Sequence, residues 1–273
     1  MAFLRIIRPF NCIFVALTVL FGAYFQRIYV YSPEVIAAVA AALLIAAGGY
    51  VINDFYDVES DKINRPDRVL PSSKMKIRTA FYYAFTLFFL GFLSSLLTRN
   101  IICVIIAALN IIILFFYSKA CQHKPLSGNL MVAYSAASTF LFGGLSNRNV
   151  KNCWIIVVFA FLYTLVREFI KDAEDIEGDQ RVGARTLAII AGTRGIVNFA
   201  LIPAFLIFLF NGYLLLTAKI TPIIFYMINL LVIIPLVLFF FILYRGTGQR
   251  RMRIVTLGMK FDMLILLVIL WIG

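Results

Sequence analysis

Two short stretches hold most of the carboxylates of this 273-residue chain. The first reads NDFYDVESD over residues 53–61, and the second reads KDAEDIEGD over residues 171–179. Each contains three aspartates separated by three and then four residues, a spacing that places them on one face of a helix. Eleven of the thirteen acidic residues lie in or beside these stretches, which ordinary loop composition does not explain. The two triads are Asp54, Asp57 and Asp61, and Asp172, Asp175 and Asp179.

The triads predict a cation site. Carboxylates gathered on one face repel one another unless positive charge lies between them. Neither stretch contains His or Cys, and ligand sets of oxygen alone favour Mg²⁺, whose remaining positions substrate phosphates commonly fill. A solvated acidic loop would explain one such stretch, but two with matching spacing favour a shared metal and diphosphate site. We assign the central chemistry to Asp54, Asp57, Asp175 and Asp179.

Basic residues near the acids are candidate ligands of phosphate oxygens. Arg binds phosphate through two parallel hydrogen bonds, and Lys acts as a point charge. We favour Arg65, Arg68 and Lys119, because they neighbour the acids or the aromatic Tyr117. For each of them, an ordinary loop charge is the alternative. The full set is Arg65, Arg68, Lys119, Lys124, Arg167 and Lys171.

The composition indicates that these residues belong to an integral membrane protein. Hydrophobic residues are 63% of the chain, charged residues 14%, and the mean hydropathy is +0.96. These values exclude soluble enzymes, secreted scaffolds, disordered chains and DNA-binding modules, because the surfaces of such proteins must be hydrated and therefore polar. One histidine and four cysteines without a C-x-x-C pair argue against a zinc site or a disulfide framework.

Long apolar runs predict nine transmembrane helices in a single all-α domain over residues 1–273. A helix needs about 20 apolar residues to cross the bilayer, and barrel strands would be far shorter. We interpret the first run as an uncleaved helix, because no small-residue cleavage site follows it. The predicted spans are 10–27, 33–52, 79–97, 101–117, 129–146, 152–170, 195–216, 221–244 and 254–272.

The loop charges predict the orientation of a multi-pass protein of the cell membrane. Nineteen Lys and Arg residues fall on the side of the N-terminus and five on the other side. Cytoplasmic loops collect these residues, so the N-terminus is predicted inside and the C-terminus outside. The net charge of +12 therefore reflects topology, and no nucleic-acid partner is expected. Both acidic stretches then open on the cytoplasmic side.

The two stretches resemble the motifs of the UbiA superfamily of intramembrane prenyltransferases. The similarity extends from NDFYDVESD through KINRPDRVLPS to residue 72, and covers REFIKDAEDIEGDQRVGARTL over residues 167–187. Weaker matches are RPFN at residues 8–11 and YSK with KPLSGN between residues 117 and 129. The resemblance implies nine helices in a ring around an apolar cavity, with a polar cap on the cytoplasmic side.

The resemblance also implies ligands and substrates. It adds Asn53 to the aspartates that hold Mg²⁺ on the diphosphate of a polyprenyl donor, and places Arg8 and Asn11 toward the acceptor. Relatives often show Tyr-x-x-x-Lys in the middle loop. Here the fourth residue after Tyr117 is Cys121, so the role of the lysine passes to Lys119 or Lys124.

The form REFIKDAEDIEGD is similar to that of archaeal digeranylgeranylglyceryl phosphate synthases. That similarity implies transfer of a geranylgeranyl group to geranylgeranylglyceryl phosphate, a lipid-like acceptor, in ether-lipid synthesis among membrane lipids. An aromatic acceptor from a quinone or chlorophyll pathway is the alternative within the family.

Two other classes of membrane protein compete with this interpretation. A transporter usually carries ionisable residues at mid-membrane depth, whereas only Lys260 and Asp262 lie well inside a predicted span, and they do not share a helix face. A CDP-alcohol phosphotransferase also uses clustered aspartates and a divalent ion, but its D-G-x-x-A-R pattern is absent from both stretches.

Overall fold

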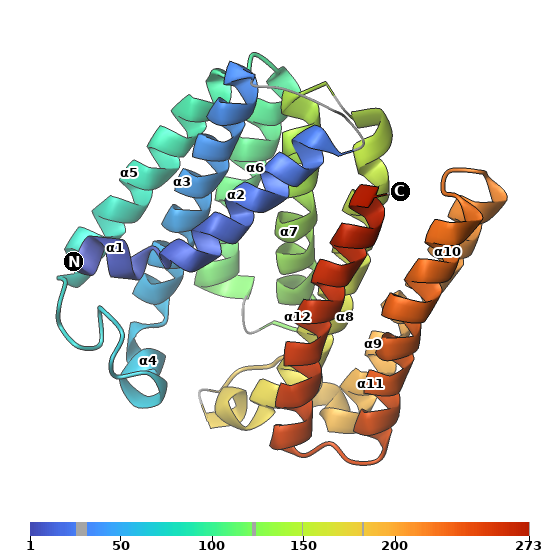
Figure 1. The fold of residues 1–273 in the computed structure, drawn as a ribbon. Helices are drawn as coiled ribbons and strands as arrows, with labels where there is room; N and C mark the ends of the chain where they lie inside the picture. The colour runs from blue at the N-terminus through green and yellow to red at the C-terminus, as the bar shows by residue number, and fades with distance from the viewer. Residues whose placement is uncertain (26–31, 122–123, 149, 182, 273) are drawn as a thin grey trace. The chain divides into compact units, whose positions relative to one another are not determined.

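A computed structural model describes residues 1–25, 32–121, 124–148, 150–181 and 183–272. These residues form helices joined by short loops, and no strand occurs among them (Figure 1). The α-helices are α1 (Ala2–Ile6), α2 (Pro9–Tyr24), α3 (Pro33–Tyr56), α4 (Val58–Asn64), α5 (Ile77–Leu96), α6 (Ile101–Phe116), α7 (Ser127–Ser146), α8 (Val150–Arg181), α9 (Leu187–Leu216), α10 (Pro222–Ile228), α11 (Ile234–Tyr244) and α12 (Gln249–Ile272). Two π-helical turns are η1 (Tyr117–Cys121) and η2 (Asn229–Ile233).

The helices confirm an all-α protein with several membrane spans. In the described part of the chain, seven helices are long and apolar enough to cross a bilayer, counting α10, η2 and α11 as one. The helix α2 is apolar but has only 16 residues, and α7 has 20 residues of mixed polarity. Each predicted span overlaps one of these helices, except that residues 26 and 27 of the first span lie outside the described residues.

The largest differences from the predicted spans are the end of α8 and the start of α9. The helix α8 continues to Arg181 because the second acidic stretch extends it beyond the apolar run. The helix α9 begins at Leu187 but contains a break at Gly192, whose φ of 71° is a left-handed value that glycine adopts without steric cost. The predicted start at residue 195 therefore lies just after this kink.

The chain divides into two compact units. Unit 1 comprises Met1–Gln122 and Ser135–Trp154, and unit 2 comprises His123–Tyr134 and Ile155–Gly273. The helices α7 and α8 contribute residues to both units. Because the first acidic stretch lies in unit 1 and the second in unit 2, each is described within its own unit.

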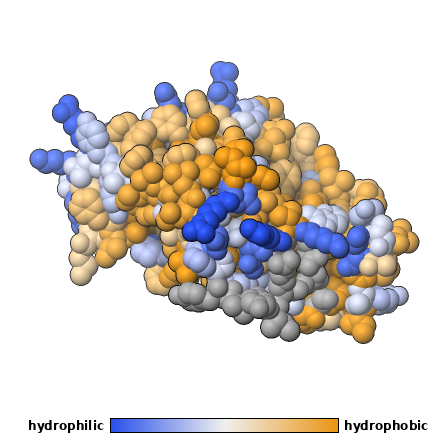
Figure 2. All heavy atoms as spheres, turned by 90° about the horizontal axis from the view of Figure 1, so that it is seen from above, coloured by the Kyte–Doolittle hydropathy of each residue, from blue (hydrophilic) through white to orange (hydrophobic). Residues whose placement is uncertain are grey.

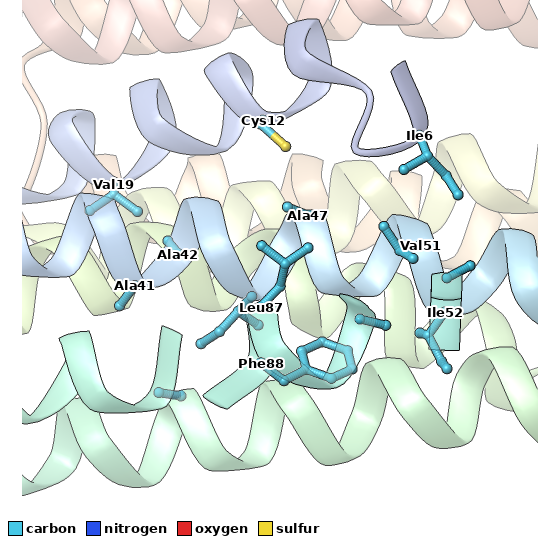
Figure 3. Close-up of a cluster of buried hydrophobic side chains, with 14 of the residues drawn as sticks. Ile6, Cys12, Val19, Ala41, Ala42, Ala47, Val51, Ile52, Leu87 and Phe88 are labelled. Atoms are coloured by element: carbon cyan, nitrogen blue, oxygen red, sulfur yellow. The ribbon is translucent and has the colours of Figure 1, made fainter. Parts of the chain in front are cut away.

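The core of unit 1 forms around α3, which packs most extensively against α5 and then against α2 and α6. Small residues such as Ala38 and Ala41 face these neighbours and are fully buried. Figure 3 shows side chains of this core, with Val51 of α3 and Phe88 of α5 among them. Small residues let helix backbones approach closely, which is how helices associate where no water drives them together. The core therefore fixes the end of α3, where the first acidic stretch begins.

Two glycines bring α2 and α7 into direct backbone contact within unit 1. A Cβ atom on Gly22 would lie 1.9 Å from the carbonyl oxygen of Phe140. A Cβ atom on Gly143 would lie 1.9 Å from the carbonyl oxygen of Val19. Neither oxygen belongs to a flexible side-chain end, so the two helices must separate before any larger residue fits.

We expect Gly143→Ala to destabilise the protein by about 1–3 kcal/mol, the usual cost of an overpacked core. Thermal unfolding in detergent measures this effect. The matched control is Gly212→Ala in α9, where nothing lies within 4 Å of an added Cβ. Equal melting temperatures for the two variants would contradict the close packing of α2 and α7.

Unit 2 contains a buried polar contact between two long helices. The hydroxyl of Tyr163 on α8 donates a hydrogen bond to the carboxylate of Asp262 on α12, and both side chains are buried. Lys260, two residues earlier, is exposed. The two ionisable residues of the last span therefore do not form a pair with each other.

Apolar side chains cover the outward faces of many helices. Phe205 on α9 and Val237 on α11 each expose 60% of their surface, and Phe261 on α12 exposes 68%. Figure 2 shows one face of the molecule, on which hydrophobic residues predominate and hydrophilic residues gather in small groups. Exposed apolar surface of this extent is typical of a protein that contacts lipid.

Candidate active site

The first acidic stretch lies where α3 passes into α4. Asn53 and Asp54 belong to the last turn of α3, and Asp61 belongs to α4. Asp57 joins the two helices with φ −86° and ψ 1°, so the helix is interrupted at this residue. The Asp57 N–H still donates to the Asn53 carbonyl, and the Asp61 N–H donates to the Asp57 carbonyl. The backbone thus keeps helix-like bonds across the junction, and the triad spacing is close to that of a helix.

Arginines bind two of the three carboxylates of this stretch. Arg68 Nη1 lies 2.6 Å from Asp61 Oδ2 and 3.3 Å from Asp54 Oδ1, and Arg8 also pairs with Asp54. The Asp54 and Asp61 side chains are only 5% and 8% exposed. Buried carboxylates require paired charges, and the guanidinium of Arg68 supplies one to both. The loop that follows α4 therefore folds back onto the motif.

The third carboxylate has a different partner. The Asn53 Nδ2 donates a hydrogen bond of 2.6 Å to Asp57 Oδ2, and both side chains are half-buried. These two residues present amide and carboxylate oxygens, which are ligands that Mg²⁺ accepts. The pair lies on the same junction as Asp54 and Asp61, the two carboxylates whose ion pairs with Arg8 and Arg68 are described above.

The substrate-binding residues predicted around the first stretch differ in their solvent exposure. Arg8 is half-buried and its guanidinium lies 5.2 Å from the ring centroid of Tyr50. Asn11, on the first turn of α2, is exposed. Arg65 is also exposed and lines a cavity of about 430 Å³ together with Arg8, Asp54 and Arg68. Two of the predicted phosphate ligands, Arg65 and Arg68, therefore meet Arg8, the residue predicted to face the acceptor, around one opening.

The middle loop differs from a regular helix. Tyr117 and Lys119 lie in the π-helical turn η1, and Tyr117 is half-buried. Lys119 is exposed, with its Nζ 5.8 Å from the ring centroid of Phe115. Lys124 is exposed in the bend before α7. Single π-turns frequently occur at functional sites. The position of η1 is compatible with diphosphate binding by either Lys119 or Lys124.

The second acidic stretch is part of one uninterrupted helix, α8. Asp175 is exposed, and its Oδ2 lies 3.7 Å from Nζ of Lys171. Asp172 and Asp179 are half-buried. Just before the stretch, Arg167 pairs with its neighbour Glu168 at 2.6 Å. Helical geometry thus places Asp172, Asp175 and Asp179 along one side of α8, as their spacing predicts.

Two polar residues that the sequence analysis did not assign to the site hold this stretch. Asn129 on α7 is buried, and its Nδ2 donates a 2.7 Å hydrogen bond to Asp172 Oδ2. Thr256 on α12 donates a 2.8 Å hydrogen bond to Glu174 Oε2. The KPLSGN segment contains Asn129, but only the folded chain shows that its last residue contacts an aspartate 43 positions away.

We expect Asn129→Ala to lower catalytic activity about 10- to 100-fold, as is typical when the partner of a metal-binding carboxylate is lost. The half-maximal Mg²⁺ concentration should rise at the same time, which a purely structural defect would not cause. Asn129→Asp places a second carboxylate beside Asp172 and should be at least as harmful. An unchanged Mg²⁺ requirement in Asn129→Ala would contradict the positioning role.

The metal ligands themselves remain a prediction. Among the described residues, no three His, Cys, Asp or Glu side chains lie close enough together to hold an ion. In unit 1, Arg68 lies between Asp54 and Asp61, and together with Arg8 it neutralises both carboxylates. The oxygen donors of Asn53, Asp57, Asp175 and Asp179 suit Mg²⁺ by their chemistry.

Comparison with known proteins identifies the family. The model of the UbiA prenyltransferase family matches residues 14–266. The chain belongs to the UbiA prenyltransferase family. It is therefore a prenyltransferase and a multi-pass membrane protein. This confirms the resemblance carried by the two acidic stretches.

Similar proteins within the UbiA family are named for one activity. A digeranylgeranylglyceryl phosphate synthase of Methanoculleus marisnigri is 44% identical over 204 residues, which cover 73% of this chain and 72% of that protein. The synthase of Methanopyrus kandleri is 41% identical over 192 residues, covering 70% of each chain. These relatives support a role for this UbiA protein in prenyl transfer for archaeal lipid synthesis.

Solved structures confirm the UbiA fold. A digeranylgeranylglyceryl phosphate synthase structure matches with a TM-score of 0.87 and 28% identity, covering 100% of this chain and 97% of that one. A UbiA homologue of Archaeoglobus fulgidus, solved with GPP and Mg²⁺, matches with a TM-score of 0.71 and 15% identity, covering 99% of both chains. The second similarity concerns the fold alone.

Proposed function

We propose that this prenyltransferase transfers a geranylgeranyl group from geranylgeranyl diphosphate to geranylgeranylglyceryl phosphate. The relatives at 41–44% identity, which are named for that reaction, carry the proposal. The arginine-lined cavity beside the first acidic stretch supports it, because an anionic acceptor needs cations near the reacting centre.

We propose that both acidic stretches contribute ligands to one metal site and that the whole chain forms one domain. Nine spans arranged in a ring around an apolar cavity, with the N-terminus in the cytoplasm, would place both stretches at the cytoplasmic membrane boundary. The overlap of every predicted span with a helix supports the count of nine. The excess of Lys and Arg in the same set of loops supports the orientation.

The proposed site divides the carboxylates into two groups. Asn53 with Asp57, and Asp175 with Asp179, would hold Mg²⁺, with Asp172 held in place by Asn129. The bound ion would neutralise the diphosphate as charge develops on the leaving group. Asp54 and Asp61 instead fix Arg68 at the mouth of the cavity, where its cation is preorganised.

In the proposed reaction the allylic C1–O bond of the donor breaks, and diphosphate leaves with the electron pair. The acceptor hydroxyl oxygen then bonds to C1, and its proton is released to the diphosphate or to water. The products are the diether phosphate and diphosphate. Basic residues near the acids, such as Lys119 and Lys171, would stabilise the departing anion.

A direct assay tests this proposal. Purified protein is incubated with Mg²⁺, radiolabelled geranylgeranyl diphosphate, and either geranylgeranylglyceryl phosphate or 4-hydroxybenzoate. We expect a labelled lipid product only with the glyceryl phosphate. Product formation only with the aromatic acid would replace the acceptor and keep the family chemistry. No product with either acceptor would reject the proposed function.

A further inference from the structure

The cavity beside the first acidic stretch contains more positive charge than its acids balance. Four arginines and two aspartates line it, and all belong to unit 1. Its volume of about 430 Å³ exceeds what a phosphate group alone would fill. The charged lining residues are Arg5, Arg8, Arg65, Arg68, Asp54 and Asp67.

The arginines of this cavity fall into two pairs. Arg8 and Arg68 form ion pairs with Asp54, so carboxylates of the protein itself largely compensate their charges. Arg5 and Arg65 are exposed and have no ion-pair partner within the described parts of the chain. Four arginines against two aspartates leave the lining a surplus of two positive charges. Asp54, with Asp61 outside the lining, balances Arg8 and Arg68, so Arg5 and Arg65 remain available to a ligand, with Asp67 as the other carboxylate of the lining.

The local backbone brings Arg5 to this position. Arg5 lies in the last turn of α1, and Arg8 ends the link to α2 in a left-handed conformation, with φ 52° and ψ 68°. Residues other than glycine seldom adopt this conformation, which costs of order 1 kcal/mol and persists only where surrounding contacts fix it. The ion pair of Arg8 with Asp54 is such a contact. Arg8 thus anchors the turn that directs α1, with Arg5, toward the cavity.

The charge of the cavity suits a doubly charged anion without a metal. A phosphate monoester carries −1.5 to −2 charges near neutral pH and offers three acceptor oxygens. Two free guanidinium groups match that charge and bind such oxygens bidentately. A metal-bound diphosphate needs carboxylate ligands, but Asp54 is already paired with Arg8 and Arg68. The buried side chains of Ile6 and Val69 add apolar lining for the carbon skeleton of the ligand.

We propose that Arg5 and Arg65 bind the phosphate monoester of the lipid acceptor and select phosphorylated acceptors over neutral ones. This inference rests on the proposed function, because it names the part of the site that the acceptor headgroup occupies. It assigns a binding role to Arg5, which no sequence motif indicates. The donor diphosphate binds elsewhere, at the Mg²⁺ ligands proposed above.

Steady-state kinetics with single substitutions test this assignment. We expect Arg5→Gln and Arg65→Gln each to raise KM for geranylgeranylglyceryl phosphate about 10- to 100-fold, the usual effect of losing a hydrogen bond to a charged group. KM for geranylgeranyl diphosphate should stay within about twofold. Arg78→Gln is the matched control, because Arg78 is an exposed arginine of unit 1 outside the cavity, and it should leave both KM values unchanged.

A second measurement tests the phosphate selectivity. The wild type should use geranylgeranylglycerol, which lacks the phosphate, far less efficiently than the phosphorylated acceptor. The double substitution of Arg5 and Arg65 by Gln should reduce that preference at least tenfold in kcat/KM. If the double variant is inactive with both acceptors, the binding affinity for geranylgeranylglyceryl phosphate is measured instead, in EDTA and without donor. The wild type should bind this acceptor, and the double variant should not.

The outcomes separate this inference from the proposed function. A wild type that transfers no prenyl group rejects the proposed function itself. An active wild type with an unchanged acceptor KM in both single variants rejects only the inference. A rise in the donor KM alone assigns the cavity to the donor diphosphate and also overturns the inference.

Discussion

Replacing Asp57 or Asp175 by alanine should lower prenyl transfer by at least about 10²–10³-fold, because each change removes an oxygen ligand from the charge-stabilising centre. Asp57 is half-buried and accepts a hydrogen bond from Asn53, and Asp175 is exposed beside Lys171. Neither carboxylate lies in the hydrophobic core, so we expect both variants to fold in detergent. The assay is Mg²⁺-dependent transfer of the radiolabelled geranylgeranyl group.

The control for these two variants lies in the same stretch. Glu59→Ala removes a carboxylate that is 77% exposed and pairs only with the neighbouring Lys62 among the contacts described. It should retain nearly full activity. If Asp57→Ala or Asp175→Ala were equally active, the assignment of metal ligands would be wrong. Their Asn variants keep an oxygen and should show a raised Mg²⁺ requirement rather than complete loss.

Replacing Arg68 by alanine should destabilise the protein more than any other surface-loop substitution considered above. The change leaves the buried carboxylate of Asp61 without its arginine and Asp54 with Arg8 alone, and breaking a buried pair typically costs about 3–5 kcal/mol. For a chain of this size, the melting temperature should fall by roughly 10 °C. Thermal unfolding in detergent provides the measurement. Arg68→Lys should recover only part of the loss, because the lysine side chain is one atom shorter and its ammonium does not reach as far as the Nη1 atom that contacts both carboxylates.

Two comparisons make this prediction specific. Lys62→Ala breaks an exposed pair with Glu59 and should cost less than about 1 kcal/mol. The combination Asp61→Asn and Arg68→Met should be more stable than Arg68→Ala, because it removes the stranded carboxylate along with the arginine and leaves Arg8 paired with Asp54. A melting temperature of Arg68→Ala equal to that of Lys62→Ala would show that Arg68 does not hold the loop.

The sequence determined the membrane class, the helices and the family. Transfer of a side chain from water to lipid depends on its own chemistry, so a run such as residues 33–52 predicts a helix without knowledge of its neighbours. The structure extends that run to Tyr56 as α3. The spacing of Asp172, Asp175 and Asp179 likewise predicted one helix face, because helical periodicity is a local property.

The tertiary structure decided which charges meet. Arg68 and Asp54 are separated by 14 residues, Arg8 and Asp54 by 46, and Asn129 and Asp172 by 43. Many lysines and arginines of the same loops could have filled these roles, and their order along the chain does not distinguish them. An ion pair or a hydrogen bond requires contact within a few ångströms, and such contacts between distant residues depend on how the helices pack. Composition and periodicity are local properties, so they predicted where the acids lie but could not reveal that arginines neutralise Asp54 and Asp61.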